Sequence, residues 1–100
     1  MMAEYSLRFI TGEGDVFSGN VESLVAPGQQ GLLGVLAHHA PLISLLKKGV
    51  VKIRQASQEY FYVIQSGILE IDGKGKALIL TDTAVALKSE NEAQEYLKKS

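Results

Sequence analysis

The stretch GVVKIRQASQEYFYVIQSGILEIDGKGKALILTD, residues 49–82, decides the fold of this chain. In its first seven residues Val51 and Ile53 oppose basic side chains, which is the period-2 pattern of a half-buried β-strand. The EYFYVIQSG that follows is rich in β-branched and aromatic residues, and DGKGK supplies the glycines of a tight hairpin turn. The stretch therefore predicts several short strands joined by tight turns.

The rest of the chain up to residue 88 repeats this pattern. Tyr5, Leu7 and Phe9 alternate with polar residues, and TGEGD at 11–15 is a turn supplied with glycines. The other predicted strands are two within 16–26, bent at Gly19-Asn20, and one each within 67–73, 76–82 and 83–88. Many short strands spaced roughly 8–12 residues apart, with turn residues between them, predict a mainly β fold. The expected architecture is an antiparallel sandwich or barrel.

The period changes only at the C-terminal end, where residues 89–99 predict a short helix. Ser89 is followed three residues later by Glu92, which is the pattern of a capping box. Ala93, Tyr96 and Leu97 fall on one helical face. We therefore expect a β domain over residues 1–88 and a short C-terminal helix over residues 89–100.

The composition excludes several classes of protein. The chain has 100 residues, 46% hydrophobic and 21% charged, with a formal net charge of -1 and no visible basic stripe, so we expect no nucleic-acid partner. Cysteine is absent, which excludes disulfide scaffolds, thiolate zinc sites and cysteine nucleophiles. The N-terminus lacks the pattern of a signal peptide, and no apolar run approaches the ~18–20 residues of a membrane span.

The segment PGQQGLLGVLAHHAP at 27–41 raises the possibility of a phosphate-binding loop. Gly28, Gly31 and Gly34 are evenly spaced, but Val35 follows the last glycine where a P-loop needs lysine. The dinucleotide-binding pattern of glycines is absent as well. We therefore assign these glycines to tight turns and close backbone approach.

Catalytic and metal sites are weakly supported. His38 and His39 are the only histidines, and adjacent residues of an extended chain point to opposite faces. The serines lack a nucleophile-elbow context, and Glu70 and Asp72 lie on the polar side of a predicted strand. We expect no catalytic residue, no metal site and no cofactor.

The surplus of apolar residues near 27–46 is the most informative feature that remains. A sheet with one solvated face cannot bury every one of them, and an exposed apolar patch marks an interaction site. This pattern predicts a surface for a protein partner, and the alternative is that all of these side chains are core. The residues are Leu32, Leu33, Val35, Leu36, Leu42, Ile43, Leu45 and Leu46.

Several motifs of this region resemble the epsilon subunit of rotary F-type ATP synthases, in its bacterial form. The stretch VFSGNVESLVAPGQQGLLGVLAHHAPLISLLKKGVVKIR contains the family's serine-glycine opening, its glycine loop from Pro27 to Leu36, and the HAPL motif. GILEI at 67–71 and LTDTA at 80–84 follow in the family's order. The resemblance covers about residues 5–88 of the chain.

The resemblance implies a ten-stranded antiparallel β-sandwich and a non-catalytic subunit of the central stalk. Such a subunit holds the gamma subunit and the c-ring, turns with both, and meets the membrane only through the ring, at the cytoplasmic face of the cell inner membrane. By position, the ring-side residues are Gln29, Gln30, Gly31, Leu32 and Leu33. The gamma-side residues are Thr11, His39, Pro41, Leu42 and Ser44.

The sequence departs from the family pattern at two places. The family's loop usually carries an acidic or polar residue where Leu32 stands. Many relatives continue into a helical hairpin, and some bind ATP through a motif that contains arginine, where this chain has Gln94. Since no guanidinium would meet the phosphates, we expect no ATP binding and no hairpin brake, with the C-terminal helix the shortened or truncated start of that hairpin.

Two other functions remain open at this point. The sandwich could be a stand-alone binding module for a small ligand or carbohydrate, with the glycine-leucine segment at the mouth of its pocket. A metal-dependent enzyme using His38 and His39 is a third hypothesis. The rotor subunit predicts co-purification with gamma, and the binding module predicts saturable binding of a small ligand without gamma. The metal-dependent enzyme predicts an activity that a chelator abolishes.

Overall fold

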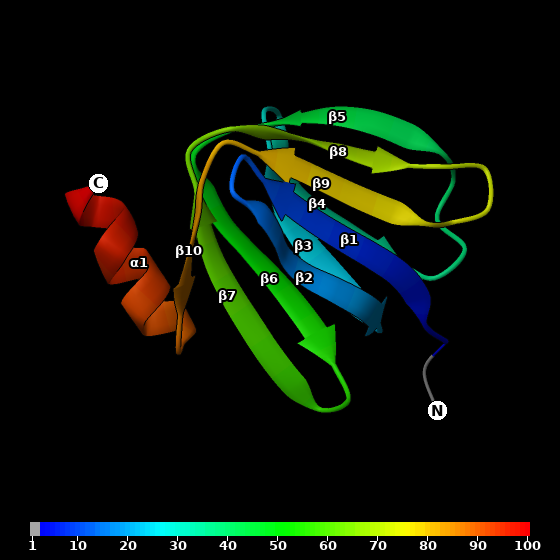
Figure 1. The fold of residues 1–100 in the computed structure, drawn as a ribbon, viewed down its shortest axis with the longest axis horizontal. Helices are drawn as coiled ribbons and strands as arrows, with labels where there is room; N and C mark the ends of the chain where they lie inside the picture. Colours follow the sequence, from blue (N-terminus) through cyan, green and yellow to red (C-terminus); the bar gives the residue numbers. More distant parts are fainter. Residues whose placement is uncertain (1–2) are drawn as a thin grey trace.

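A computed structural model describes residues 3–100, which form ten β-strands and one α-helix (Figure 1). The predicted mainly β fold with a short C-terminal helix is confirmed. The strands are β1 (Tyr5–Thr11), β2 (Gly14–Val21), β3 (Ser23–Gly28), β4 (Gly31–Leu36), β5 (Leu42–Leu46), β6 (Gly49–Gln55), β7 (Gln58–Ile64), β8 (Gly67–Ile71), β9 (Ala77–Thr81) and β10 (Ala84–Leu87), and the helix is α1 (Glu90–Lys99).

The strands form two layers that are joined at one corner. One layer has the order β4-β3-β6-β7-β10 and the other β5-β8-β9-β1-β2. The corner is a single residue pair between β3 and β5, Gly28 with Leu46. The strand pairs of the described residues are antiparallel except β1 with β9, which is parallel. The predicted antiparallel sandwich is therefore correct apart from this one pair.

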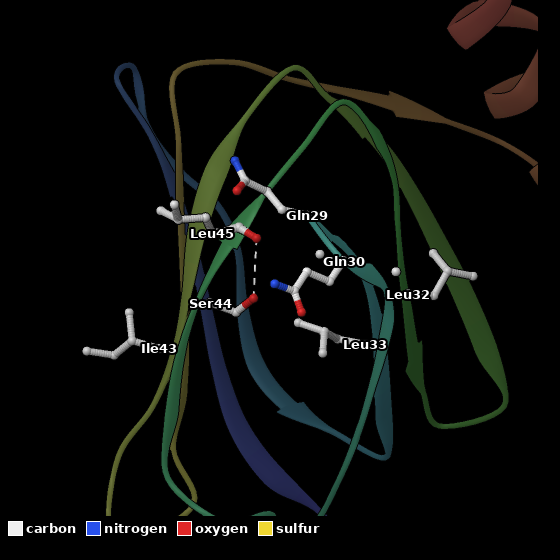
Figure 2. Close-up of a pocket in the computed structure, with 9 residues that line it drawn as sticks. Gln29, Gln30, Leu32, Leu33, Ile43, Ser44 and Leu45 are labelled. Carbon is white, nitrogen blue, oxygen red and sulfur yellow. Dashed lines mark hydrogen bonds between the residues drawn. The ribbon is translucent and has the colours of Figure 1, made fainter.

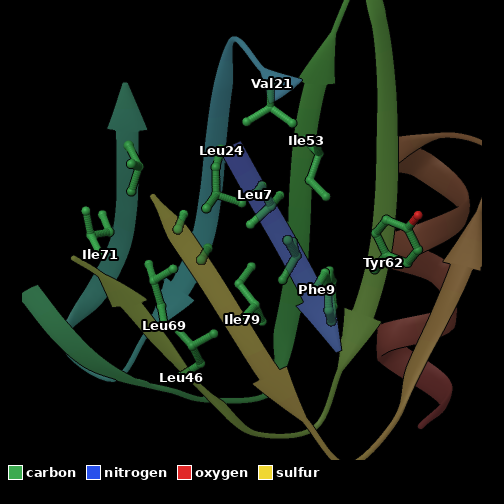
Figure 3. Close-up of a cluster of buried hydrophobic side chains, with 14 of the residues drawn as sticks. Leu7, Phe9, Val21, Leu24, Leu46, Ile53, Tyr62, Leu69, Ile71 and Ile79 are labelled. Carbon is green, nitrogen blue, oxygen red and sulfur yellow. The ribbon is translucent and has the colours of Figure 1, made fainter. Parts of the chain in front are cut away.

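The core lies between the two layers and is filled by the inward-pointing side chains, which alternate with outward-pointing ones along the strands (Figure 3). Phe9 on β1 and Tyr62 on β7 meet edge to face across it, with ring centroids 5.1 Å apart. The hydroxyl of Tyr5 donates to the carbonyl oxygen of Val35 at 2.7 Å and ties β1 to β4. Burial raises the pKa of Tyr5, so this phenol remains a hydrogen-bond donor. The fully buried side chains include Leu7, Phe9, Leu24, Leu46, Ile53, Leu69 and Ile79.

Two turns show how local sequence ends the strands. The β8–β9 turn is held by Asp72, whose Oδ1 accepts the backbone N–H groups of Lys74 and Lys76 at 2.8 and 2.9 Å. These bonds lower the pKa of the Asp72 carboxyl. The tight turn predicted for DGKGK is therefore confirmed. The β3–β4 turn consists of Gln29 and Gln30, followed by Gly31 at a φ of 137° that favours glycine.

Helix α1 begins with the predicted cap. The Oγ of Ser89 accepts the N–H of Glu92 at 3.1 Å. The carboxylate of Glu92 reaches back to the N–H of Lys88 at 3.0 Å, one residue before the cap. The first bond satisfies a backbone donor that the first turn of a helix leaves free, and the second satisfies a donor just before the cap.

The helix covers the outer face of β6, β7 and β10 (Figure 1). Ala93 is buried against Phe61 and Val63, and Leu97 packs at the edge of this second cluster. Tyr96, predicted on the same helical face as Ala93 and Leu97, is 39% exposed, so it lies at the margin of the face that packs on the sheet. Among residues 3–100, no helix is long and apolar enough to cross a membrane.

Two local predictions differ from the structure. The bend expected at Gly19-Asn20 lies instead at Glu22, because β2 stays paired with β1 through Val21. The glycine loop expected from Pro27 to Leu36 is instead the end of β3, a two-residue turn and the whole of β4, and LISLL in the following segment forms β5. Their β-branched and leucine side chains pack on the core from one face, which strand geometry permits and a loop does not.

The β6–β7 hairpin carries strain that substitution should relieve. Ala56 and Ser57 form its two-residue turn with φ values of 49° and 70°, where residues with a Cβ are disfavoured. We expect Ala56→Asn with Ser57→Gly to raise the free energy of unfolding by about 1 kcal/mol, because this pair adopts such turns readily. Urea denaturation measures the change, and Ala56→Val is the matched control that should lower stability. An unchanged midpoint in the Asn-Gly variant would contradict the assignment of strain.

Candidate partner-binding surfaces

A groove lies between the β3–β4 hairpin and β5 (Figure 2). Its volume is about 380 Å³. The hairpin tip is tied to β5 by a bond from the N–H of Gln29 to the carbonyl oxygen of Leu45 at 3.1 Å. The Oγ of Ser44 donates to the same carbonyl at 3.2 Å. The lining residues are Gly28, Gln29, Gln30, Gly31, Leu32, Leu33, Ile43, Ser44 and Leu45, and none of them is charged.

The groove brings together all five residues predicted for the ring side and one predicted for the gamma side, Ser44. Leu32 is 75% exposed, whereas Leu33 is half-buried and packs against the main core. The expectation that both leucines are surface residues is therefore correct for Leu32 only. The reason is the alternation of β4, which turns successive side chains to opposite faces.

The other four gamma-side residues lie outside the groove. Thr11 ends β1 and is buried, and its Oγ1 bonds the carbonyl of Gly14 and the N–H of Glu13 within the turn. His39, Pro41 and Leu42 follow β4 in the chain, and Leu42 packs against the core. The Nδ1 of His39 contacts the carbonyl oxygen of Ala40 at 2.7 Å.

The predicted surplus of exposed apolar side chains is confirmed. Leu36 is 57% exposed and Ile43 is 72% exposed, and Leu45 joins Leu32 on the surface. Val35 and Leu46 are buried in the core, while the exposed side chains show that the alternative, in which all of the segment's apolar residues are core, is wrong. Each strand of this segment divides its side chains between core and surface.

A second apolar surface was missed by sequence reasoning. Leu45, Ile68, Leu80 and Ile10 stand in register across β5, β8, β9 and β1, on the outer face of their layer. Leu45, Ile68 and Leu80 are 54%, 40% and 43% exposed, and Ile10 is half-buried. We call these four residues the outer row. The signal was present in KALILTD, which carries apolar residues at successive positions and so has an apolar residue on each face.

Catalytic chemistry gains no support from the described residues. Within residues 3–100, no group of three or more histidine, aspartate or glutamate side chains could hold a metal ion. Paired charges such as Arg54 with Glu22, at 3.4 Å, lie on the surface. The described part of the sandwich thus has two uncovered apolar surfaces. Such surfaces are typical of protein-binding domains.

The chain matches known proteins of one family. The family described as the ATP synthase Delta/Epsilon chain β-sandwich domain matches residues 4–87. The ATP synthase epsilon chain of Campylobacter curvus is 42% identical over 94 residues, which are 93% of this chain and 72% of that one. The chain belongs to the ATP synthase epsilon subunit family, as the resemblance predicted.

Solved structures show the same fold. A chain in the Euglena gracilis mitochondrial ATP synthase, in a structure of OSCP, F1 and c-ring, superposes with a TM-score of 0.81 and 21% identity. It is covered over 64% of its length and covers 99% of this chain. A chain in the central stalk and c-ring of the Tetrahymena thermophila enzyme gives a TM-score of 0.72 at 13% identity, over 84% of this chain and 67% of its own.

The division of β4 into two faces is testable by a pair of substitutions. Leu33→Asp should lower the free energy of unfolding by about 2–4 kcal/mol, because it places a charge against the core. Leu32→Asp should change it by less than about 0.5 kcal/mol, since Leu32 is a surface residue. Urea denaturation of both variants measures the difference. Equal losses of stability would contradict the assignment.

Proposed function

We propose that the chain is a non-catalytic rotor subunit of the central stalk in a proton- or sodium-driven ATP synthase. In this function it holds the gamma subunit to the c-ring, so that rotation of the ring passes to gamma without slippage. Its place is peripheral, at the cytoplasmic face of the inner membrane, and its contact with the membrane runs through the ring. The outer row is the observation that carries the proposal, because a soluble sheet does not normally leave such a row uncovered.

The outer row supports the assignment of the gamma side. Ser44 directly precedes Leu45 at one end of the row, and Thr11 directly follows Ile10 at the other. Two residues assigned to gamma by resemblance are thus chain neighbours of the row, but Thr11 is buried and Ser44 alternates with Leu45, so the row itself would make the contact. A standard interface covers about 800 Å² per partner and depends on a few apolar anchors, for which this row is suited.

The hairpin tip supports the assignment of the ring side. Gln29 and Gln30 are exposed at the turn, and Leu32 projects beside them. The tip is braced against β5 by main-chain bonds from Gln29 to Leu45 and from Lys47 to Pro27, at 3.1 and 2.8 Å. A braced tip loses little conformational freedom when a partner binds, which favours affinity.

A charged substitution in the outer row tests the contact with gamma. Ile68→Asp should raise the Kd for the gamma subunit about tenfold or more, since it places a charge at the centre of the interface. The fold should persist because Ile68 points outward. Ala86→Asp, an exposed position on β10 in the other layer, is the matched control and should leave the Kd unchanged. An unchanged Kd of the Ile68→Asp variant for gamma would contradict the assignment of the outer row. Saturable binding of a small ligand without gamma would favour a stand-alone binding module.

The start of α1 bears on ATP binding. Glu90 and Glu92 occupy its first turn, and the carboxylate of Glu90 lies 3.9 Å from the Nζ of Lys52. Acidic side chains at a helix N-terminus repel phosphates there, and Gln94 offers no guanidinium. Calorimetric titration of the chain with ATP should therefore give no binding at micromolar concentrations. A saturating heat in that range would overturn the expectation.

A further inference from the structure

The groove is bordered by the main-chain edges of β4 and β5 as well as by side chains. Within residues 3–100, β4 pairs with β3 alone. β5 pairs with β8 along its length, and its other edge meets β3 only at the corner formed by Gly28 and Leu46. The two layers diverge from this corner, so one edge of β4 presents main-chain N–H and C=O groups toward the groove without a strand partner.

The edge of β4 also lacks the usual protection. Edge strands are commonly blunted by charged residues, by proline or by shortness. β4 is six residues long, GLLGVL, with neither a charge nor a proline, and Leu32 and Leu36 are strongly exposed. Such an edge is a template for pairing with another extended chain.

The groove is continuous with the outer row. Leu45 belongs to both, and Ile43 lines the groove on the same face of β5. A partner that covers the outer row therefore reaches the mouth of the groove without leaving the protein surface. The neutral lining of the groove, with the polar groups of Gln30 and Ser44, fits an uncharged segment rather than an acidic or basic one.

We propose that the partner on the outer row, the gamma subunit, inserts an extended, uncharged segment that pairs with the free edge of β4. This inference rests on the proposed function and specifies how the partner is held. Main-chain hydrogen bonds to the unpaired edge of β4 fix the segment. Gly34 leaves open space beside the strand, since a Cβ there would meet nothing within 4 Å. Strand addition joins the partner to the core layer itself, which suits a joint that carries torque.

Residue-level hydrogen–deuterium exchange tests the pairing. The chain is measured alone and in complex with the gamma subunit, without the c-ring. Alternate amides of β4 should exchange rapidly in the free chain and at least tenfold more slowly in the complex, while those that face β3 are slow in both states. The amides of β10, the edge strand at the far end of the same layer, serve as the internal control and should not change.

The outcomes separate this inference from the proposed function. A stable complex in which β4 amides exchange at the free rate would overturn strand addition and leave the rotor function intact. Protection that appears only when the c-ring is added would also overturn it, because gamma would not be the donor. Protection in the free chain that grows with protein concentration would assign the edge to a second copy. Absence of any complex with gamma would overturn both proposals.

Discussion

Burial of the inner faces of two sheet layers is the constraint on which the rest of this structure depends. Successive side chains of a strand point to opposite faces of the sheet. The side chains that pack in the core therefore determine which ones remain on the outside. Leu33 and Val35 pack inward and leave Leu32 and Leu36 exposed, and Leu69 is buried while Ile68 faces out. The layers join at a single residue pair between β3 and β5, which leaves the edges of β4 and β5 diverging and opens the groove.

The two apolar surfaces have a common origin in this arrangement. The outer row is the solvent side of the layer whose other side forms half of the core, and no helix covers it in the described part of the chain. The opposite layer has α1 packed over Phe61 and Val63 on its outer face. One layer is thus covered by α1, whereas the other leaves its apolar outer row exposed in the described residues. The positions of both surfaces are fixed by the same packing that stabilises the sandwich.

Much of the fold could be predicted from the sequence because its signals are local. The alternation around Val51 and Ile53, the turn at Asp72 and the cap at Ser89 each act within a few residues, and all three are present. The outer row could not be predicted, since it depends on the register of four strands spread from Ile10 to Leu80. The same holds for the groove, which requires the hairpin tip to bond β5 across sixteen residues of chain, from Gln29 to Leu45.

The central claim is that the outer row is covered in the assembled rotor. Carbene footprinting of the chain, free and within the complex of gamma and c-ring, measures the accessibility of each aliphatic side chain. The account predicts that Leu45, Ile68 and Leu80 are labelled in the free chain and protected in the complex, while the exposed Ala86 of β10 is labelled in both. Equal labelling of the outer row in the two states would contradict it.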